Sequence, residues 1–129
     1  MSESSQSEPR GELQIRTLAM PADTNPSGDI FGGWVLSQMD VAGGILAATK
    51  AKGRVATVAV DGMTFYLPVF VGDIVCCYGD VVRIGRTSIA VNVQAWALRA
   101  NSTERCLVTE GVYTYVAIGN DRKPRPIES

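Results

Sequence analysis

Histidine is absent from this chain of 129 residues. Without an imidazole there can be no Ser-His-Asp or Cys-His pair, no histidine proton shuttle and no histidine metal ligand. If the protein catalyses a reaction, carboxylates, amides and backbone dipoles must carry the chemistry.

Cysteine is scarce, and its spacing matches no common site. The three cysteines are the adjacent pair Cys76 and Cys77 and the isolated Cys106. This odd number fits neither a disulfide framework nor the spacing of a zinc site. We therefore expect reduced cysteines in the core and no metal centre.

The sequence also lacks a strong net charge and a long apolar run. A net charge of −1 gives no overall attraction to nucleic acid. No apolar run approaches the roughly 20 residues that a membrane span needs, and the first residues lack the basic-then-apolar pattern of a secretory signal. We expect a cytoplasmic protein that binds neither nucleic acid nor membranes.

The length and the hydrophobic content of 46% suit a single domain with a real core. Residues 1–12 are polar and without periodicity, which predicts a flexible N-terminal arm. We place the folded domain at residues 13–118 and an irregular C-terminal tail at residues 119–129.

Turn-forming residues at 21–29 precede a proline-free apolar stretch that predicts a helix at about 33–50. The rest of the domain has the β-branched and aromatic pattern of strands, the last three joined by connections too short for crossover helices. The sequence thus predicts an α+β fold in which one helix packs on a curved antiparallel sheet, with strands at 13–20, 55–66, 73–84, 87–99 and 105–118.

The predicted helix is apolar around most of its circumference, whereas a sheet covers only one side of a helix. We infer that the same helix of a second subunit covers the other side. Gly43 and Gly44 would permit close backbone approach there.

Asp40 lies among the apolar residues of this helix, and burial of a carboxylate is one way to make a general base. The alternative is a structural aspartate that caps or pairs across an interface. Gly32 and Gly33 would leave free N–H groups at the helix N-terminus for developing negative charge, and the Asn25 amide could orient water or a carbonyl. By itself the glycine pair is weak evidence, since it can be a mere turn, and an asparagine before Pro-Ser-Gly is more often simply a turn residue.

Most basic residues of the chain are expected to be solvated. Arg86 is singled out because it sits in a tight turn with Thr87 and Ser88, where side-chain and backbone donors could converge on a phosphate.

Several separated motifs together resemble the hot-dog acyl-CoA thioesterases of the YciA type. They run in the right order from about Leu13 to Pro126 and comprise NPSGDIFGGWVLSQMD at 25–40, GRV at 53–55, GMTF at 62–65, Pro68, VGD at 71–73 and GRTS at 85–88. The resemblance implies a hot-dog fold, a dimer as the minimal unit and a trimer of dimers with active sites between subunits.

The same resemblance implies hydrolysis of acyl-CoA to a free acid and CoA, without a further cofactor. By position, Asp40 matches the catalytic acid, Asn25 an asparagine contributed across the dimer interface, and Gly33 an N–H donor to the thioester oxygen. The implied CoA contacts are Gly32, Arg86, Thr87, Ser88, Lys123 and Arg125.

Two other functions remain open. Hot-dog hydratases and dehydratases use a histidine with an acid, so the composition counts against them. A non-catalytic acyl-CoA-binding protein of the same fold is the second alternative. Whether Asp40 would act as a general base or as a nucleophile also stays open.

Overall fold

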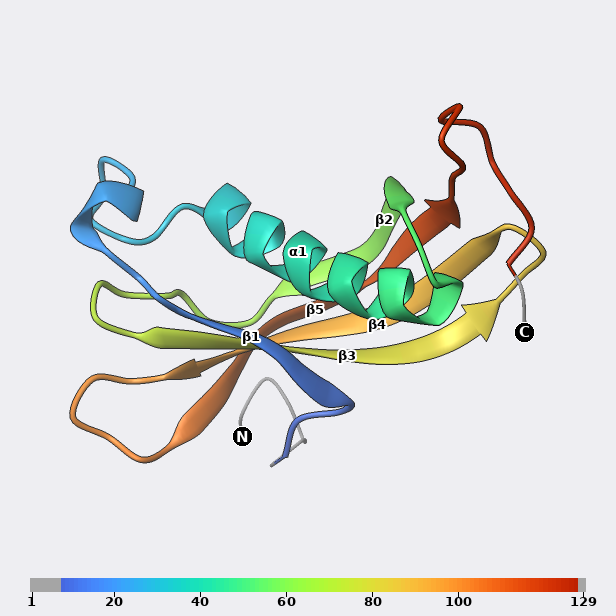
Figure 1. The fold of residues 1–129 in the computed structure, drawn as a ribbon. Helices are drawn as coiled ribbons and strands as arrows, with labels where there is room; N and C mark the ends of the chain where they lie inside the picture. Colours follow the sequence, from blue (N-terminus) through green and yellow to red (C-terminus); the bar gives the residue numbers. More distant parts are fainter. Residues whose placement is uncertain (1–7, 128–129) are drawn as a thin grey trace.

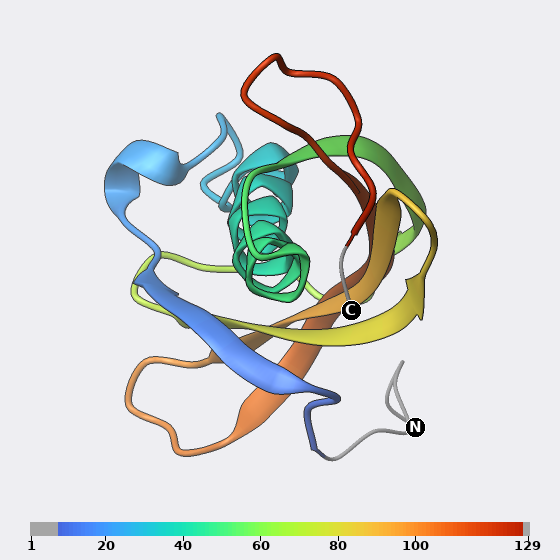
Figure 2. The ribbon, with the colours of Figure 1, turned by 45° about the vertical axis from the view of Figure 1, so that its right-hand side comes forward.

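The computed structural model describes residues 8 to 127 and confirms the α+β layout (Figure 1). One long helix lies along a five-stranded antiparallel sheet, and the sheet curves around the helix. Figure 2, a view nearly along the helix, shows this curvature. The elements in chain order are β1 (Glu12–Leu18), the short 3-10 helix η1 (Pro21–Asp23), α1 (Gly32–Ala51), β2 (Val55–Phe65), β3 (Ile74–Ile84), β4 (Ser88–Leu98) and β5 (Arg105–Ala117).

The strand order in the sheet is β1-β3-β4-β5-β2. The predicted antiparallel meander of the last three strands is confirmed, with Cys76 opposite Trp96 and Asn92 opposite Val112. β1 and β2 are added at the two edges of this meander. Among residues 8 to 127, the outer edge of β2 has no strand beside it.

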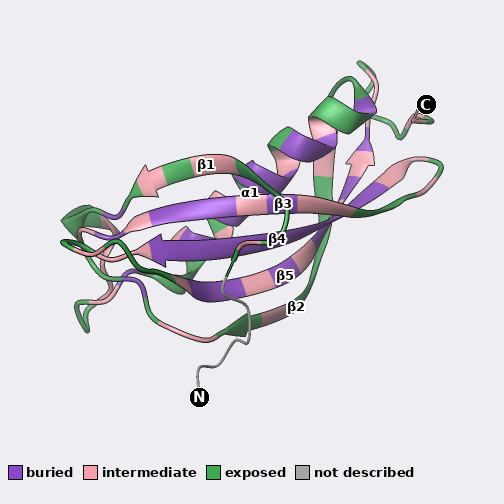
Figure 3. Ribbon diagram, turned by 90° about the horizontal axis from the view of Figure 1, so that it is seen from below, coloured by how far each residue is buried: buried purple, intermediate pink, exposed green. Residues whose placement is uncertain are grey.

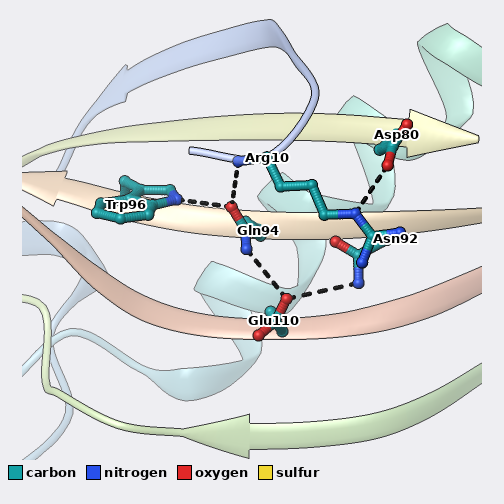
Figure 4. Close-up of polar contacts among 6 residues, drawn as sticks. All are labelled: Arg10, Asp80, Asn92, Gln94, Trp96 and Glu110. Carbon is teal, nitrogen blue, oxygen red and sulfur yellow. Dashed lines mark hydrogen bonds and ion pairs between the residues drawn. The ribbon is translucent and has the colours of Figure 1, made fainter. Parts of the chain in front are cut away.

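β4 is buried on both faces along almost its whole length (Figure 3). Its inner face carries Val91 and Val93 toward α1, as expected for the central strand of the core. Its outer face carries a hydrogen-bonded polar group instead (Figure 4). There the Gln94 amide oxygen accepts from the Arg10 backbone N–H (2.8 Å) and from the Trp96 indole N–H (2.9 Å).

Polar contacts on the outer face of the sheet also fix part of the predicted N-terminal arm. The Arg10 guanidinium pairs with Asp80 of β3 at 2.7 Å, so residues 10–12 are tied to the sheet. Residues 1–7 of the arm lie outside the described residues, as do residues 128 and 129 of the predicted tail.

Helix α1 begins after the predicted turn and ends where Lys52 adopts a left-handed backbone conformation, φ 58°. Its inward side is apolar, whereas Val41 and Ile45 on the other side are 53% and 43% exposed in the single chain. This exposed apolar side agrees with the inference that a further element covers the helix. No helix among residues 8 to 127 is long and apolar enough to cross a membrane.

One interpretation of the helix was wrong. Gly43 does not face a second helix: it is buried against Tyr115 of β5, and a Cβ at this position would overlap the tyrosine hydroxyl. Gly44 faces the same ring, at 3.7 Å for its hypothetical Cβ. Gly43 thus admits a side chain of its own chain, whereas a Cβ at Gly44 would make only an ordinary contact with that ring, and the interpretation of Gly44 stays a prediction.

Candidate active site

Asp40 projects from the middle of α1 toward the β2–β5 side of the sheet and is half-buried. Its Oδ1 atom accepts a hydrogen bond from the Thr57 hydroxyl at 2.6 Å and one from the Tyr115 hydroxyl at 3.1 Å. Among the described residues, Oδ2 accepts none. One oxygen of the carboxylate is therefore fixed, and the other keeps its lone pairs for a ligand.

A cavity of about 260 Å³ lies beside this carboxylate. Its wall is mainly apolar, and the lining residues are Leu36, Ser37, Asp40, Thr57, Val60 and Tyr113. A carboxylate at the wall of an apolar cavity can accept a proton from a bound water or attack an electrophilic carbon directly.

Sheet register explains how two strands reach the same oxygen. Thr57 of β2 and Tyr115 of β5 are direct cross-strand partners, so their side chains lie on the same face of the sheet. The register of β2 shifts just after Thr57, between Thr57 and Ala59. Such a bulge changes the direction of the strand next to the site.

Tyr113 and Tyr115 stand side by side on β5, with ring centroids 6.4 Å apart. Burial raises the pKa of both hydroxyls well above the usual value, and the negative charge of Asp40 raises them further. Both groups therefore stay protonated as donors through the neutral and mildly alkaline range.

Sequence reasoning missed Thr57, Tyr113 and Tyr115. For the two tyrosines the signal was the strand period: they alternate with residues that the structure shows as half-buried, so both belong to the face that meets the helix. Nothing in the sequence indicates which part of the helix they meet.

Asn25 lies in a second cavity, of about 350 Å³, at the N-terminal end of α1. This cavity is lined by Asn25, Asp29, Ile30, Gly32, Val35, Phe65, Tyr66, Leu67, Pro68 and Val69. The Asn25 side-chain oxygen accepts from the N–H groups of Ser27 (2.9 Å) and Asp29 (3.1 Å). The oxygen thus stabilises the turn, and the amide NH₂ is the end left for a ligand.

The helix N-terminus also has free donors. Within residues 8 to 127, the backbone N–H groups of Gly32 and Gly33 find no acceptor, as the first turn of a helix allows. From Gly33 to Asp40 the helix rises by roughly 10 Å. Within one chain, therefore, Asp40 lies apart from both Asn25 and the Gly33 N–H.

The predicted phosphate contacts gather at the other end of the helix. The Arg86 carbonyl accepts from Ile127, and the Thr87 carbonyl accepts from Ala117, both at 2.8 Å, so the β3–β4 turn and the C-terminal tail lie together. Arg86 and Lys123 are exposed, and the Ser88 carbonyl closes the turn.

Arg125 is differently placed from the other two cations. Its guanidinium donates to the carbonyls of Ala51 (2.9 Å) and Ile118 (3.1 Å), which ties the tail to the C-terminus of α1. Its donors are thus largely committed to the protein backbone, and its first role is structural.

The cysteines lie as the sequence predicts. Cys76 and Cys77 are buried free thiols, and Cys106 is half-buried and also free. Burial raises the pKa of the Cys77 thiol to about 12. No group of three or more cysteine, aspartate or glutamate residues within 8 to 127 could hold a metal ion.

Comparison with known proteins places this geometry in a family. The family model of the thioesterase superfamily matches residues 27–102. The acyl-CoA thioester hydrolase YciA of Salmonella typhimurium is 56% identical over 122 residues, which cover 92% of each chain.

Solved structures agree with the sequence relatives. The hexameric thioesterase of Yersinia pestis has a TM-score of 0.91 and 54% identity, covering 95% of this chain and 99% of that one. A hexameric hotdog fold thioesterase of Campylobacter jejuni has a TM-score of 0.86 and 46% identity, covering 92% and 91%. The chain therefore belongs to the thioesterase superfamily of hot-dog proteins and, within it, to the YciA-type acyl-CoA thioester hydrolases.

Proposed function

We propose that the chain hydrolyses acyl-CoA thioesters to a carboxylic acid and CoA, with Asp40 as the catalytic carboxylate. The observation that carries this proposal is the Asp40 carboxylate, held through Oδ1 by Thr57 and Tyr115 beside an apolar cavity. The family membership supports the reaction class.

Hydrolysis of the thioester can follow either of two routes. As a general base, Asp40 takes a proton from water while the water oxygen attacks the acyl carbon. The C–S bond then breaks, and the protonated Asp40 gives its proton to the leaving CoA thiolate. As a nucleophile, the carboxylate attacks the acyl carbon and expels CoA, and water then hydrolyses the mixed anhydride. Both routes place negative charge on the thioester oxygen, which N–H donors stabilise.

The site is proposed to form between two copies of the chain. Asn25 and Asp40 line different cavities of one chain, and Gly33 follows Gly32 of the Asn25 cavity, so a second copy can supply the missing group to each cavity. The exposed apolar side of α1 and the edge of β2, which no strand among residues 8 to 127 covers, are surfaces that such a partner could use. We propose a dimer as the minimal unit and a trimer of dimers, which the hexameric relatives support.

For the CoA portion we propose contacts from Gly32 and from the cationic end of the molecule: Arg86, Thr87, Ser88 and Lys123, with Arg125 in the supporting position described above. Within one chain the helix rises by roughly 16 Å from Asp40 to Ala51, so this cationic end lies well away from the Asp40 of the same chain. No cofactor beyond the CoA of the substrate enters the proposal, and a cytoplasmic location remains a prediction.

A thiol-release assay tests the proposed function. The purified protein is mixed with short, medium, long and aromatic acyl-CoAs, and free CoA is measured over time against protein-free controls. We expect CoA release that follows the protein concentration. Saturable binding of the same acyl-CoAs with no release above the control would instead identify a non-catalytic acyl-CoA-binding protein.

Arg86→Ala is expected to raise KM for acyl-CoA about tenfold, because a charge-assisted contact to phosphate is lost. KM for the matching acyl-pantetheine thioester, which lacks the nucleotide, should change little. The matched control is Arg105→Ala, which removes an exposed arginine at the opposite end of the β4–β5 pair. Equal rises in KM for both substrates would contradict the phosphate assignment.

A further inference from the structure

Tyr115 makes an unusual double contact with the proposed catalytic residue. Its hydroxyl lies 2.9 Å from the Asp40 backbone carbonyl and 3.1 Å from the Asp40 Oδ1 atom. The tyrosine itself is 1% exposed, so its ring is fixed by the core. A single rigid group thus contacts both the main chain and the side chain of Asp40.

The helix is shaped to admit this hydroxyl. Gly43 lies one turn after Asp40, and any side chain at that position would overlap the Tyr115 hydroxyl. Glycine inside a helix is destabilising by roughly 0.5–1 kcal/mol relative to alanine. The helix is therefore less stable locally at Gly43, the position where the Tyr115 hydroxyl needs space.

Tyr113 also places its hydroxyl against a backbone carbonyl of the helix, but it reaches no carboxylate within residues 8 to 127. Its hydroxyl donates to the Leu36 carbonyl at 2.9 Å, one helical turn before Asp40, and its ring is as deeply buried as that of Tyr115. The two tyrosines make the same type of hydroxyl-to-helix bond, but only Tyr115 reaches a side-chain oxygen.

We propose that Tyr115 is a positioning residue: together with Thr57 it fixes Oδ1 of Asp40 and so presents Oδ2 to the substrate. This inference rests on the proposed function of Asp40. It assigns the reactive oxygen and a residue that acts through Asp40 without touching the substrate. Fixing the carboxylate rotamer in this way places the reactive atom before the substrate arrives.

Tyr115→Phe tests the inference by removing the hydroxyl and keeping the ring. We expect kcat to fall about tenfold while KM changes by less than about twofold. Tyr113→Phe is the matched variant, since it loses a hydroxyl-to-carbonyl bond of the same length and keeps the ring that lines the cavity. Urea unfolding midpoints should fall similarly in both variants, but the fall in kcat should be several-fold smaller for Tyr113→Phe.

A second pair of variants approaches the same hydroxyl from the helix. Gly43→Ala is expected to displace the Tyr115 hydroxyl and to lower kcat as Tyr115→Phe does. Gly44→Ala adds the same methyl group where the ring lies at an ordinary contact distance of 3.7 Å, so its kcat should stay at the wild-type value. The comparison of Gly43→Ala with Gly44→Ala tests the positioning role of Tyr115 even if Tyr115→Phe does not fold.

The possible results separate this inference from the function on which it rests. Loss of CoA release in Asp40→Asn, together with equal effects on kcat for Tyr115→Phe and Tyr113→Phe, would overturn the positioning role alone. A wild-type kcat for Gly43→Ala would do the same. Wild-type CoA release by Asp40→Asn would overturn both the proposed function and the inference.

Discussion

Replacement of Asp40 by asparagine is expected to abolish measurable CoA release, a fall on the order of 10³ in kcat. Asparagine has the same shape, and its amide oxygen can still accept the hydrogen bonds from Thr57 and Tyr115. It has no basic oxygen with which to take a proton from water, and its amide is a poor nucleophile. The variant therefore removes the chemistry and keeps the local structure.

Two measurements make this expectation specific. Size-exclusion chromatography should show the same oligomer for Asp40→Asn and the wild-type protein. Glu104→Gln serves as the control, because it makes the same charge change at an exposed position in the connection between β4 and β5. If Asp40→Asn releases CoA at a rate near that of Glu104→Gln, the carboxylate has no catalytic role.

The largest loss of stability is expected from Arg99→Leu, at about 3 kcal/mol in the free energy of unfolding. Asp73 is only 2% exposed, and Arg99 is its cationic partner. Removal of the guanidinium leaves a buried carboxylate without a countercharge. Arg99 also donates to the Pro68 carbonyl at 3.0 Å and lies over the ring of Phe70, so the wall of the Asn25 cavity should loosen as well.

Urea unfolding measures this difference, and the chain offers a matched ion pair. Arg10 and Asp80 are also in contact, but their side chains are 45% and 41% exposed. Arg10→Ala should therefore cost less than about 1 kcal/mol, because water screens and replaces the lost charge. Adding Asp73→Asn to Arg99→Leu should restore part of the stability. Similar losses for Arg99→Leu and Arg10→Ala would show that burial does not set the strength of the Asp73 pair.

Local chemistry made much of the fold predictable. The helix was expected at about 33–50 and spans Gly32–Ala51, because a turn-rich segment fixes its start and Lys52 and Gly53 follow its end. The meander of β3, β4 and β5 follows from short connections between β-branched segments. The place of β2 beside β5 was not predicted, because this pairing joins strands far apart in the sequence.

The residues of the candidate site also fall into two groups: those that the local sequence identifies, and those whose position depends on pairing between distant strands. Asp40 could be selected because a charged residue stands out in an apolar helix. Thr57 and Tyr115 could not, since their approach to Asp40 depends on the register between β2 and β5. Gly43 was misinterpreted for the same reason: the sequence shows that something must come close to it, but only the structure shows that this is Tyr115.

The buried thiols have a practical consequence for enzymology. Cys76 and Cys77 are shielded from solvent, and the Cys77 thiol holds its proton far above neutral pH. The chromogenic disulfide reagents used to measure the thiol of free CoA react with exposed thiolates. These two cysteines should therefore give little background colour in the folded state. Cys106 is free and only half-buried, so a control without substrate has to subtract its reaction before free coenzyme is read continuously at neutral pH. Signal from the protein beyond that one thiol would report that its β3 strand has opened.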